Sequence, residues 1–182
     1  METRIEHLHA LELPTPFPVG PITVFLADAP GEPLTLVDTG PLTHETIAAL
    51  EAALTRHGCA PRDLERILLT HGHVDHVGLA ADLAAASGAE VVSHPWNVPA
   101  LEGDPGERET RVAFYARLLR QAGVPGSIEQ AVGQATRAMN GFMRPVAVGA
   151  TVDEGDVLRL AGLEWQVLHT PGHAGGLICL YE

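Results

Sequence analysis

The sequence predicts an α/β fold in a single domain, residues 1–182, with a helical insert at about 96–143. Short apolar and β-branched runs alternate with helical patterns in the first half of the chain, which is typical of an α/β arrangement. A chain of 182 residues can bury one sizeable core, whereas the insert is too short to hold a core of its own.

The first half of the chain predicts the order strand, strand, helix, strand, helix, strand. Turn residues at 29–32 separate the first two strands, so we expect a hairpin. Thr43 can cap the first helix, and Gly58 follows its end. The expected elements are strands at 21–26 and 33–38, a helix at 43–57, a strand at 66–70, a helix at 76–86 and a strand at 90–93.

The insert is predicted to contain two amphipathic helices, around 112–119 and 128–139. Ser127 and Gln130 have the spacing of a capping box at the start of the second helix. Trp96 and Tyr115 are expected in the core, unless the insert covers a site and needs them as its lining. After the insert, strands are expected at 146–148, 157–160, 165–170 and 177–181.

Composition and charge narrow the class of function. The formal net charge is −12, so we expect no nucleic-acid partner, because an acidic surface repels a polyphosphate backbone. All basic side chains other than histidine are Arg, which excludes a Schiff-base lysine and a phosphate-loop lysine. No apolar run approaches the roughly 20 residues that span a bilayer. Cys59 and Cys179 lie far apart and no signal peptide precedes them, so a cytoplasmic protein is expected.

Four potential metal ligands fall within six residues: His71, His73, Asp75 and His76. His71 and His73 are two positions apart at a strand end, so both can point to the same side. Imidazole and carboxylate ligands suit zinc, iron or manganese. A polar turn with solvated histidines is the alternative, but three histidines and an aspartate at one strand end favour a metal site.

His173 follows the predicted strand 165–170 at a sharp Pro171-Gly172 turn. It would complete a facial set with His71 and His73 and leave a position open for water, as catalytic zinc sites require. His94 could also approach this site. His169 precedes the turn within a strand, where a buried and hydrogen-bonded side chain is expected rather than a ligand.

Three blocks of the sequence resemble the metallo-β-lactamase superfamily. THGHVDHVG at 70–78 resembles its metal motif, LVDTG at 36–40 its upstream block and TPGH at 170–173 its downstream block. The resemblance runs from about Pro21 to the last residue. It implies the αβ/βα sandwich of that superfamily, and it specifies the substrate poorly because the fold hosts many activities.

The resemblance also implies roles for the site residues. The implied metal ligands are His71, His73 and His173 for a first ion, and Asp75 and His76 for a second. Asp38 would lie behind them and orient the metal loop, and Asp75 would position the nucleophile or shuttle its proton. The expected cofactor is zinc, as two ions in the complete protein, with iron or manganese as alternatives.

The family pattern continues with a bridging aspartate and a final histidine, and neither follows His173 here. Asp153 and Asp156 precede His173, so they do not fit the bridging role in the family's order. We therefore interpret the chain as C-terminally incomplete. A fragment, a truncated gene product and a divergent form all fit this pattern.

The leading hypothesis is a hydrolase that uses a metal-activated hydroxide on a small ester, thioester or lactone. The alternatives are a mononuclear non-haem iron oxygenase of the persulfide dioxygenase type, and a non-catalytic truncated metal-binding domain. A small-molecule substrate is the expected partner, without a membrane partner. The apolar strand 177–181 has an edge that can pair with another chain, which leaves open a homo-oligomer.

Overall fold

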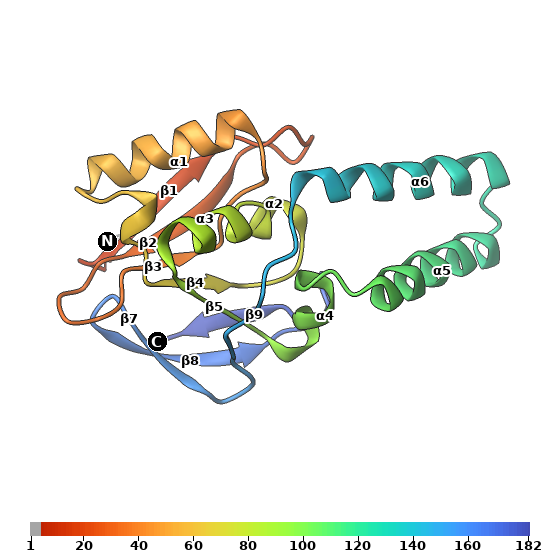
Figure 1. Cartoon of the computed structure of the whole chain (residues 1–182). Coiled ribbons are helices and arrows are strands. Elements are labelled where there is room, and N and C mark those ends of the chain that lie inside the picture. The colour runs from red at the N-terminus through yellow and green to blue at the C-terminus, as the bar shows by residue number, and fades with distance from the viewer. Residues whose placement is uncertain (1–4) are drawn as a thin grey trace, which may run out of the picture.

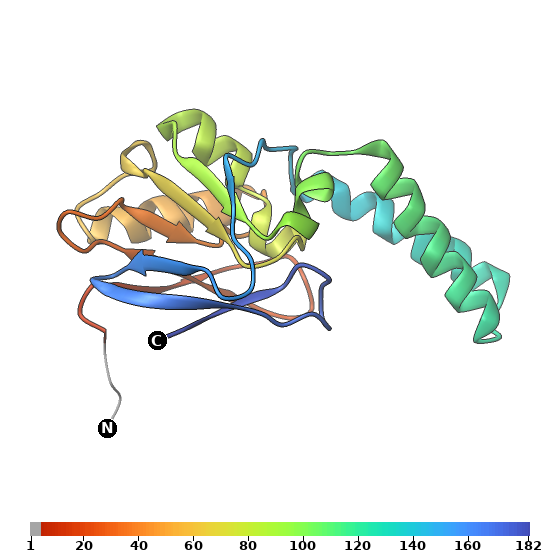
Figure 2. The same cartoon turned by 90° about the horizontal axis from the view of Figure 1, so that it is seen from below.

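The computed structural model describes residues 5–182, which form three layers (Figures 1 and 2). The middle layer is a six-stranded sheet with neighbouring strands in the order β1 (Leu8–Leu13), β2 (Ile22–Ala27), β3 (Thr35–Val37), β4 (Arg66–Leu69), β5 (Glu90–Ser93) and β6 (Ala150–Thr151). Helices α1 (His44–Arg56) and α3 (Ala80–Ser87) cover one face. The other face packs on a sheet of β7 (Val157–Leu160), β8 (Leu163–His169) and β9 (Ile178–Tyr181).

The predicted order is confirmed from β2 to β5, including the hairpin formed by β2 and β3, whereas β1 was not predicted. β1, β2 and β3 are antiparallel, whereas β3, β4, β5 and β6 run parallel to one another. The carboxyl ends of parallel strands meet at the same edge of a sheet, where α/β proteins place their ligands. Asp38, His71 and His94 follow β3, β4 and β5 at this edge.

Two apolar clusters hold the layers together. Leu36 and Ile67 are fully buried against the helices, and their neighbours Val37 and Leu68 are buried against the second sheet. Strands that are buried on both faces read as continuous apolar runs, which is why β3 and β4 lack a polar alternation. Each fully buried aliphatic side chain stabilises the fold by about 1.5–3 kcal/mol.

The predicted helix at 76–86 is wrong in one respect, because it is divided into α2 (Val74–Val77) and α3. The backbone N–H of Leu79 donates to Gly40 O (3.1 Å), so it does not continue the helix that begins at Val74. Three stretches of backbone meet here. A Cβ on Gly78 would lie 2.5 Å from Leu42 N and 2.6 Å from Pro41 Cα, so only glycine fits.

The insert is helical, as predicted. Its elements are η2 (Pro95–Asn97), α4 (Val98–Leu101), α5 (Pro105–Gln121), α6 (Gly126–Met139) and η3 (Asn140–Phe142). α5 and α6 pack against each other as a hairpin that projects from one end of the layers (Figures 1 and 2). The capping box at Ser127 is a wrong prediction, because the N-cap of α6 is Pro125, two residues earlier, and it forms no side-chain cap. Among the described helices, none is long and apolar enough to cross a bilayer.

The strand predicted at 146–148 is also wrong. Val146 is buried in the cluster beneath the helices, as its apolar character predicts, but its N–H donates to Leu101 O (2.8 Å) at the end of α4. The chain joins the sheet only at β6, where Ala150 pairs with Val92 of β5. The apolar run at 146–148 thus packs in the core without pairing as a strand.

Candidate metal centre

The histidine-rich run lies where β4 ends and α2 begins, at the edge where the parallel strands end. His71 is buried, with 3% of its surface exposed. Its ring centroid lies 4.7 Å from that of His73 and 4.2 Å from that of His76. The N–H groups of His76 and Val77 donate to His73 O, so the run is a short helix and not a solvated turn.

His173 reaches the same place from the turn between β8 and β9. Its ring centroid lies 4.4 Å from that of His73 and 5.1 Å from that of His71. One ligand atom from each of these three histidines lies within 4.8 Å of the others. The N–H of Ile178 donates to Thr70 O (3.0 Å), which joins the second sheet to the end of β4. The structure therefore brings together all three residues predicted for the first ion.

The proton positions around His71 leave one ring nitrogen free. Thr70 Oγ1 donates its one proton to Asp38 Oδ2 (2.7 Å). Thr70 Oγ1 must therefore accept, not donate, in its hydrogen bond with His71 Nδ1 (3.1 Å). The proton of the His71 ring is therefore on Nδ1, and Nε2 carries a lone pair. His71 Nε2 is buried and has no hydrogen-bond partner within residues 5–182. A buried polar atom without a partner is costly, and a metal ion would satisfy it.

Asp38 lies directly behind the cluster, in the place that the resemblance implies. Its Oδ1 accepts from Thr70 N (2.8 Å), and its Oδ2 is 2.8 Å from His76 Nδ1. The residue is 4% exposed and has a φ of 60°, a left-handed conformation that only Asn, Asp and Gly adopt readily. Such a carboxylate orients a histidine ligand and increases its basicity.

His76 and Asp75 face each other at the second predicted site. Because His76 Nδ1 bonds to Asp38, its Nε2 is the nitrogen left for coordination, and it lies 3.6 Å from Asp75 Oδ2. Burial disfavours a charged His76, but the hydrogen bond and the charge of Asp38 outweigh it and raise the pKa of His76. The hydrogen bond to Asp38 thus sets both the orientation and the electrostatics of this ring.

The pKa values of the other two histidines in the run, His71 and His73, are shifted in the opposite direction. Burial, together with the neighbouring histidines, lowers the pKa of His71 to about 3. Burial and His173 lower the pKa of His73 as well, and the positive charge of Arg111 adds to this effect. Both rings are thus held neutral at ordinary pH, and neutral imidazole is the form that coordinates a metal.

A second group of potential ligands lies beside the first. His94, Asp153 and His169 also place one ligand atom each within 4.8 Å of the others, and the two imidazole rings stack at 4.0 Å. The nitrogens of His94 are both occupied, since Nδ1 accepts from Trp96 N (3.1 Å) and Nε2 bonds to Asp153 (3.1 Å). His169 Nε2 bonds to Gly175 O (2.8 Å), as expected for a hydrogen-bonded rather than a ligating histidine.

Asn97 contributes to the site although the sequence did not single it out. Its Nδ2 donates to Gly176 O (2.8 Å) and to Ser93 Oγ (3.0 Å), so it fixes the turn that carries His173 to the end of β5. A Cβ on Gly176 would lie 2.7 Å from Asn97 Cγ, so this glycine is required for the contact. The only feature of the sequence that could have indicated this contact is the pair of glycines at 175–176.

An open cavity of about 600 Å³ lies between the histidine cluster and the insert. His73, Asp75 and His173 form part of one wall. Side chains of the insert form the other, including Trp96, Arg111, Tyr115 and Met139. Trp96 is 66% and Tyr115 51% exposed, so the structure bears out the alternative that the sequence left open: both residues line the cavity and neither lies in the core.

A family model described as "Metallo-beta-lactamase superfamily" matches residues 17–182. A probable metallo-hydrolase of Bacillus subtilis, YqjP, is 34% identical over 97% of this chain and 54% of its own length. The hydroxyacylglutathione hydrolase GloC of Haemophilus influenzae is 31% identical over 66% of this chain and 45% of its own length. The chain thus spans about half the length of these relatives.

Solved structures share the same architecture. A metallo-beta-lactamase family protein from Thermus thermophilus superposes with a TM-score of 0.77 and 32% identity, over 96% of this chain and 55% of that chain. A subclass B3 metallo-beta-lactamase of Bradyrhizobium japonicum superposes with a TM-score of 0.64 at 21% identity, over 94% of this chain and 52% of that one, which supports the fold alone.

Proposed function

Since the chain belongs to the metallo-beta-lactamase superfamily, we propose that it forms the metal-binding part of a hydrolase of small esters, thioesters or lactones. The unpaired, buried Nε2 of His71 carries this proposal. It lies among two further histidines, beside a cavity large enough for a small molecule. An arrangement that leaves a buried nitrogen unsatisfied is stable when a ligand satisfies it.

The donor set fits metal ions. His71, His73 and His173 would hold a first ion, and Asp75 with His76 would hold a second. We propose zinc for both, because imidazole with carboxylate is a usual zinc donor set. Bound metal supplies one chemical effect, which is to lower the pKa of water from about 15.7 towards 7 and so provide hydroxide at neutral pH.

The protein's own residues have separate tasks in this proposal. Asp38 holds the His76 ring by its Nδ1 proton, so that Nε2 points to the site. Asp75 is partly exposed on the cavity wall, where its carboxylate can accept the proton of the attacking water and deliver it to the leaving group. Side chains of the insert form one wall of the cavity and so limit the size of the substrate.

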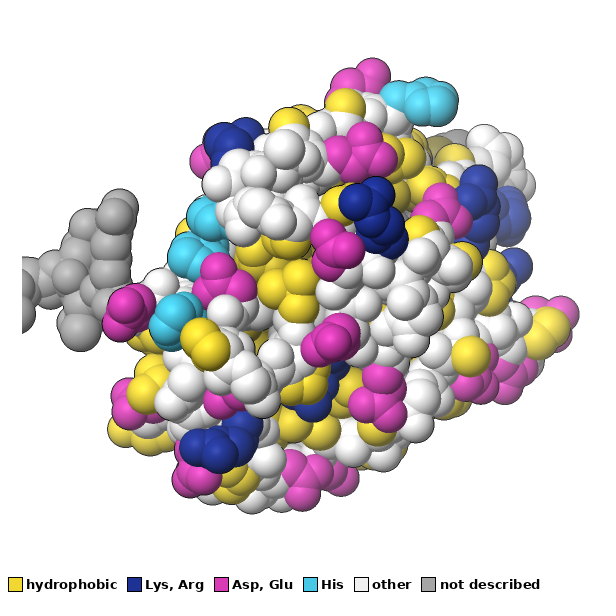
Figure 3. Space-filling model, turned by 60° about the vertical axis from the view of Figure 1, so that its left-hand side comes forward, with side chains coloured by type: hydrophobic (Ala, Val, Ile, Leu, Met, Phe, Trp, Pro, Cys, Tyr) yellow, Lys and Arg dark blue, Asp and Glu magenta, His cyan; other side chains and the backbone are white. Residues whose placement is uncertain are grey.

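A small acyl compound fits the cavity better than a polymer. Acidic side chains are distributed over the whole face that Figure 3 shows, in line with the net charge of −12. Such a surface disfavours nucleic acid. The printed name of the Haemophilus influenzae relative, a hydroxyacylglutathione hydrolase, supports an acyl substrate. Cys59 and Cys179 are both free in the described part of the chain, which supports our placement in the cytoplasm.

Metal content and turnover test the proposal together. Protein purified without added metal should contain zinc, and zinc-loaded protein should hydrolyse members of a panel of chromogenic esters, thioesters and lactones. His71→Ala protein is the matched control for contaminating esterases. If the purified protein instead contains iron and consumes oxygen, it is an oxygenase and not a hydrolase. If the protein contains zinc but hydrolyses no member of the panel, the chain is a metal-binding domain and the proposed hydrolase activity is wrong.

A further inference from the structure

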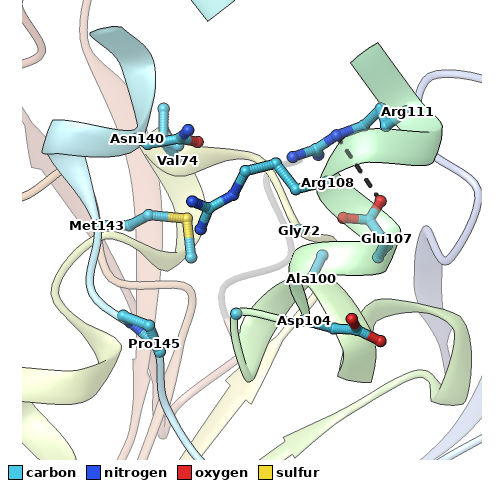
Figure 4. Close-up of a pocket in the computed structure, with 11 residues that line it drawn as sticks. Gly72, Val74, Ala100, Asp104, Glu107, Arg108, Arg111, Asn140, Met143 and Pro145 are labelled. Atoms are coloured by element: carbon cyan, nitrogen blue, oxygen red, sulfur yellow. Dashed lines mark ion pairs between the residues drawn. The ribbon is translucent and has the colours of Figure 1, made fainter. Parts of the chain in front are cut away.

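Two arginines of α5 face the metal loop from the insert. Figure 4 shows Arg108 and Arg111 extending from this helix in the same direction, towards Val74 and Asn140. Both line a cavity of about 200 Å³ with Gly72 and Val74 of the metal loop. Arg111 also lines the larger cavity that His73, Asp75 and His173 border. In a chain with a net charge of −12, these are positive charges placed beside the candidate site.

Arg111 is incompletely satisfied in this position. Its Nε is buried and has no hydrogen-bond partner among residues 5–182. Glu107 approaches from one turn earlier, but its carboxylate is 3.7 Å from that Nε, which is too long for a hydrogen bond (Figure 4). No carboxylate in the described part of the chain forms an ion pair with Arg108.

The charge of Arg111 also reaches the cluster. It makes the smallest of the contributions that lower the pKa of His73, after burial, His173 and His76. A guanidinium that faces a metal-binding site repels the cations bound there, so its position costs free energy unless an anion lies between them. The planar guanidinium binds carboxylate and phosphate with two parallel hydrogen bonds, and a single arginine therefore recognises an oxyanion selectively.

We propose that Arg111, with Arg108 beside it, is an oxyanion-binding subsite that holds a carboxylate or phosphate group of the substrate. This inference rests on the proposed function, and it narrows the substrate from small acyl compounds to anionic ones. The anionic group lies at the insert, and the bond to be hydrolysed lies at the histidine cluster. Tyr115 and Met139 of the same cavity contact the apolar part of the molecule.

Kinetics with matched substrates test the subsite. The probes are three thioesters with the same acyl chain, which ends in a methyl, a carboxylate or a phosphate group. We expect Arg111→Met to raise KM for one or both anionic thioesters about 10- to 100-fold, since a charge-assisted hydrogen bond is lost. The KM for the methyl thioester should change less than about twofold, and kcat should change little because the contact is to the anionic group and not to the reacting bond.

Glu107 provides a test in the opposite direction. Its carboxylate competes for Arg111, so Glu107→Gln should lower KM for the anionic thioesters and leave the methyl thioester unchanged. Arg117→Met and Glu109→Gln are the matched controls, because both residues are exposed on α5 and line neither cavity. Neither control should change the ratio of the KM values.

Binding to the metal-free protein separates the subsite from the hydrolysis. At pH 8, calorimetry with malonate and with inorganic phosphate should detect weak binding to the wild type and to Arg117→Met, but none to Arg111→Met. If the protein binds these anions but hydrolyses none of the thioesters, the oxyanion-binding subsite stands and the proposed function is wrong. If the protein hydrolyses all three thioesters with equal KM values, and these values are unchanged in Arg111→Met, the proposed function stands and the oxyanion-binding subsite is wrong.

Discussion

Two histidine clusters lie side by side in this protein, and they differ in where their protons are. In the first, His71 Nε2 is buried without a partner among the described residues, 5–182, and Asp38 orients His76 from behind. In the second, both nitrogens of His94 and one of His169 are used in hydrogen bonds to the protein. Both clusters bring three potential ligand atoms within 4.8 Å.

Proximity of suitable residues is therefore not sufficient to identify a metal site. His94 Nδ1 accepts the Trp96 N–H, so its proton is on Nε2, the nitrogen that faces Asp153. Coordination by that nitrogen would require the proton to move and the Trp96 hydrogen bond to break. The second cluster supports the first, because His169 Nε2 donates to Gly175 O in the turn that carries His173.

The largest expected effect distinguishes the two clusters directly. His71→Ala removes a ligand of the first ion and should weaken zinc binding by more than the roughly 10- to 100-fold typical of an outer partner. His94→Ala should lower the free energy of unfolding, by about 1–3 kcal/mol for the unsatisfied groups alone, and leave the zinc content unchanged. Competition with a chromogenic chelator measures both. Equal zinc loss in the two variants would abolish the distinction.

Asp38→Asn tests the orienting carboxylate. We expect zinc affinity to fall about 10- to 100-fold, because the amide cannot match the charge that stabilises the His76 proton. Asn tolerates the positive φ of this position, so the backbone should be retained. Asp28→Asn is the matched control, since Asp28 is likewise bonded to histidine side chains, those of His7 and His9, but away from the cluster. Unchanged zinc affinity in Asp38→Asn would reduce Asp38 to a turn residue.

Gly78→Ala tests the backbone that holds the first cluster. Its Cβ would meet the backbone of Pro41 and Leu42 within 2.6 Å, so the metal loop or its neighbours must shift. Overpacking of this kind costs about 1–3 kcal/mol of stability. Gly126→Ala is the control, because its Cβ would meet nothing within 4 Å at the start of α6. Urea unfolding compares the two, and equal stability would show that the loop yields without cost.

The smallest expected effect concerns the second cluster. His169→Phe retains an aromatic ring against His94 but removes the hydrogen bond to Gly175 O, so stability should fall by about 1 kcal/mol. Zinc affinity should fall less than tenfold, because His173 itself remains and Asn97 still holds Gly176. A loss as large as that of His173→Ala would make His169 a ligand.

The two clusters also show what the sequence could predict. The run at 70–78 is a local motif, so it predicted the residues that the structure brings together, and the strand-turn pattern at 165–173 predicted how His173 joins them. His94, Asp153 and His169 come from three distant segments without a common motif, so only the fold reveals them as a group. The strands β2, β3, β4 and β5 were predictable because apolar periodicity records burial, whereas the order of the strands within the sheet was not predicted.

Other features were not predictable for related physical reasons. The break after α2 depends on three backbone segments that meet at Gly78. The chain at Val146 bonds to α4, which the sequence does not encode locally. Arg111 has the pattern of an ordinary surface residue on a helix, and its place beside His73 follows only from the direction in which the insert projects.

The assignment of His71 as a metal ligand and of His94 as a hydrogen-bonded structural residue is tested most directly by a long-range ¹H–¹⁵N correlation spectrum of the histidine side chains, recorded before and after zinc is added. We expect His71 Nε2 to be unprotonated without zinc and its resonance to shift when zinc binds. His94 should keep its proton on Nε2 throughout. A protonated Nε2 on His71, or a zinc-dependent change at His94 with none at His71, would contradict it.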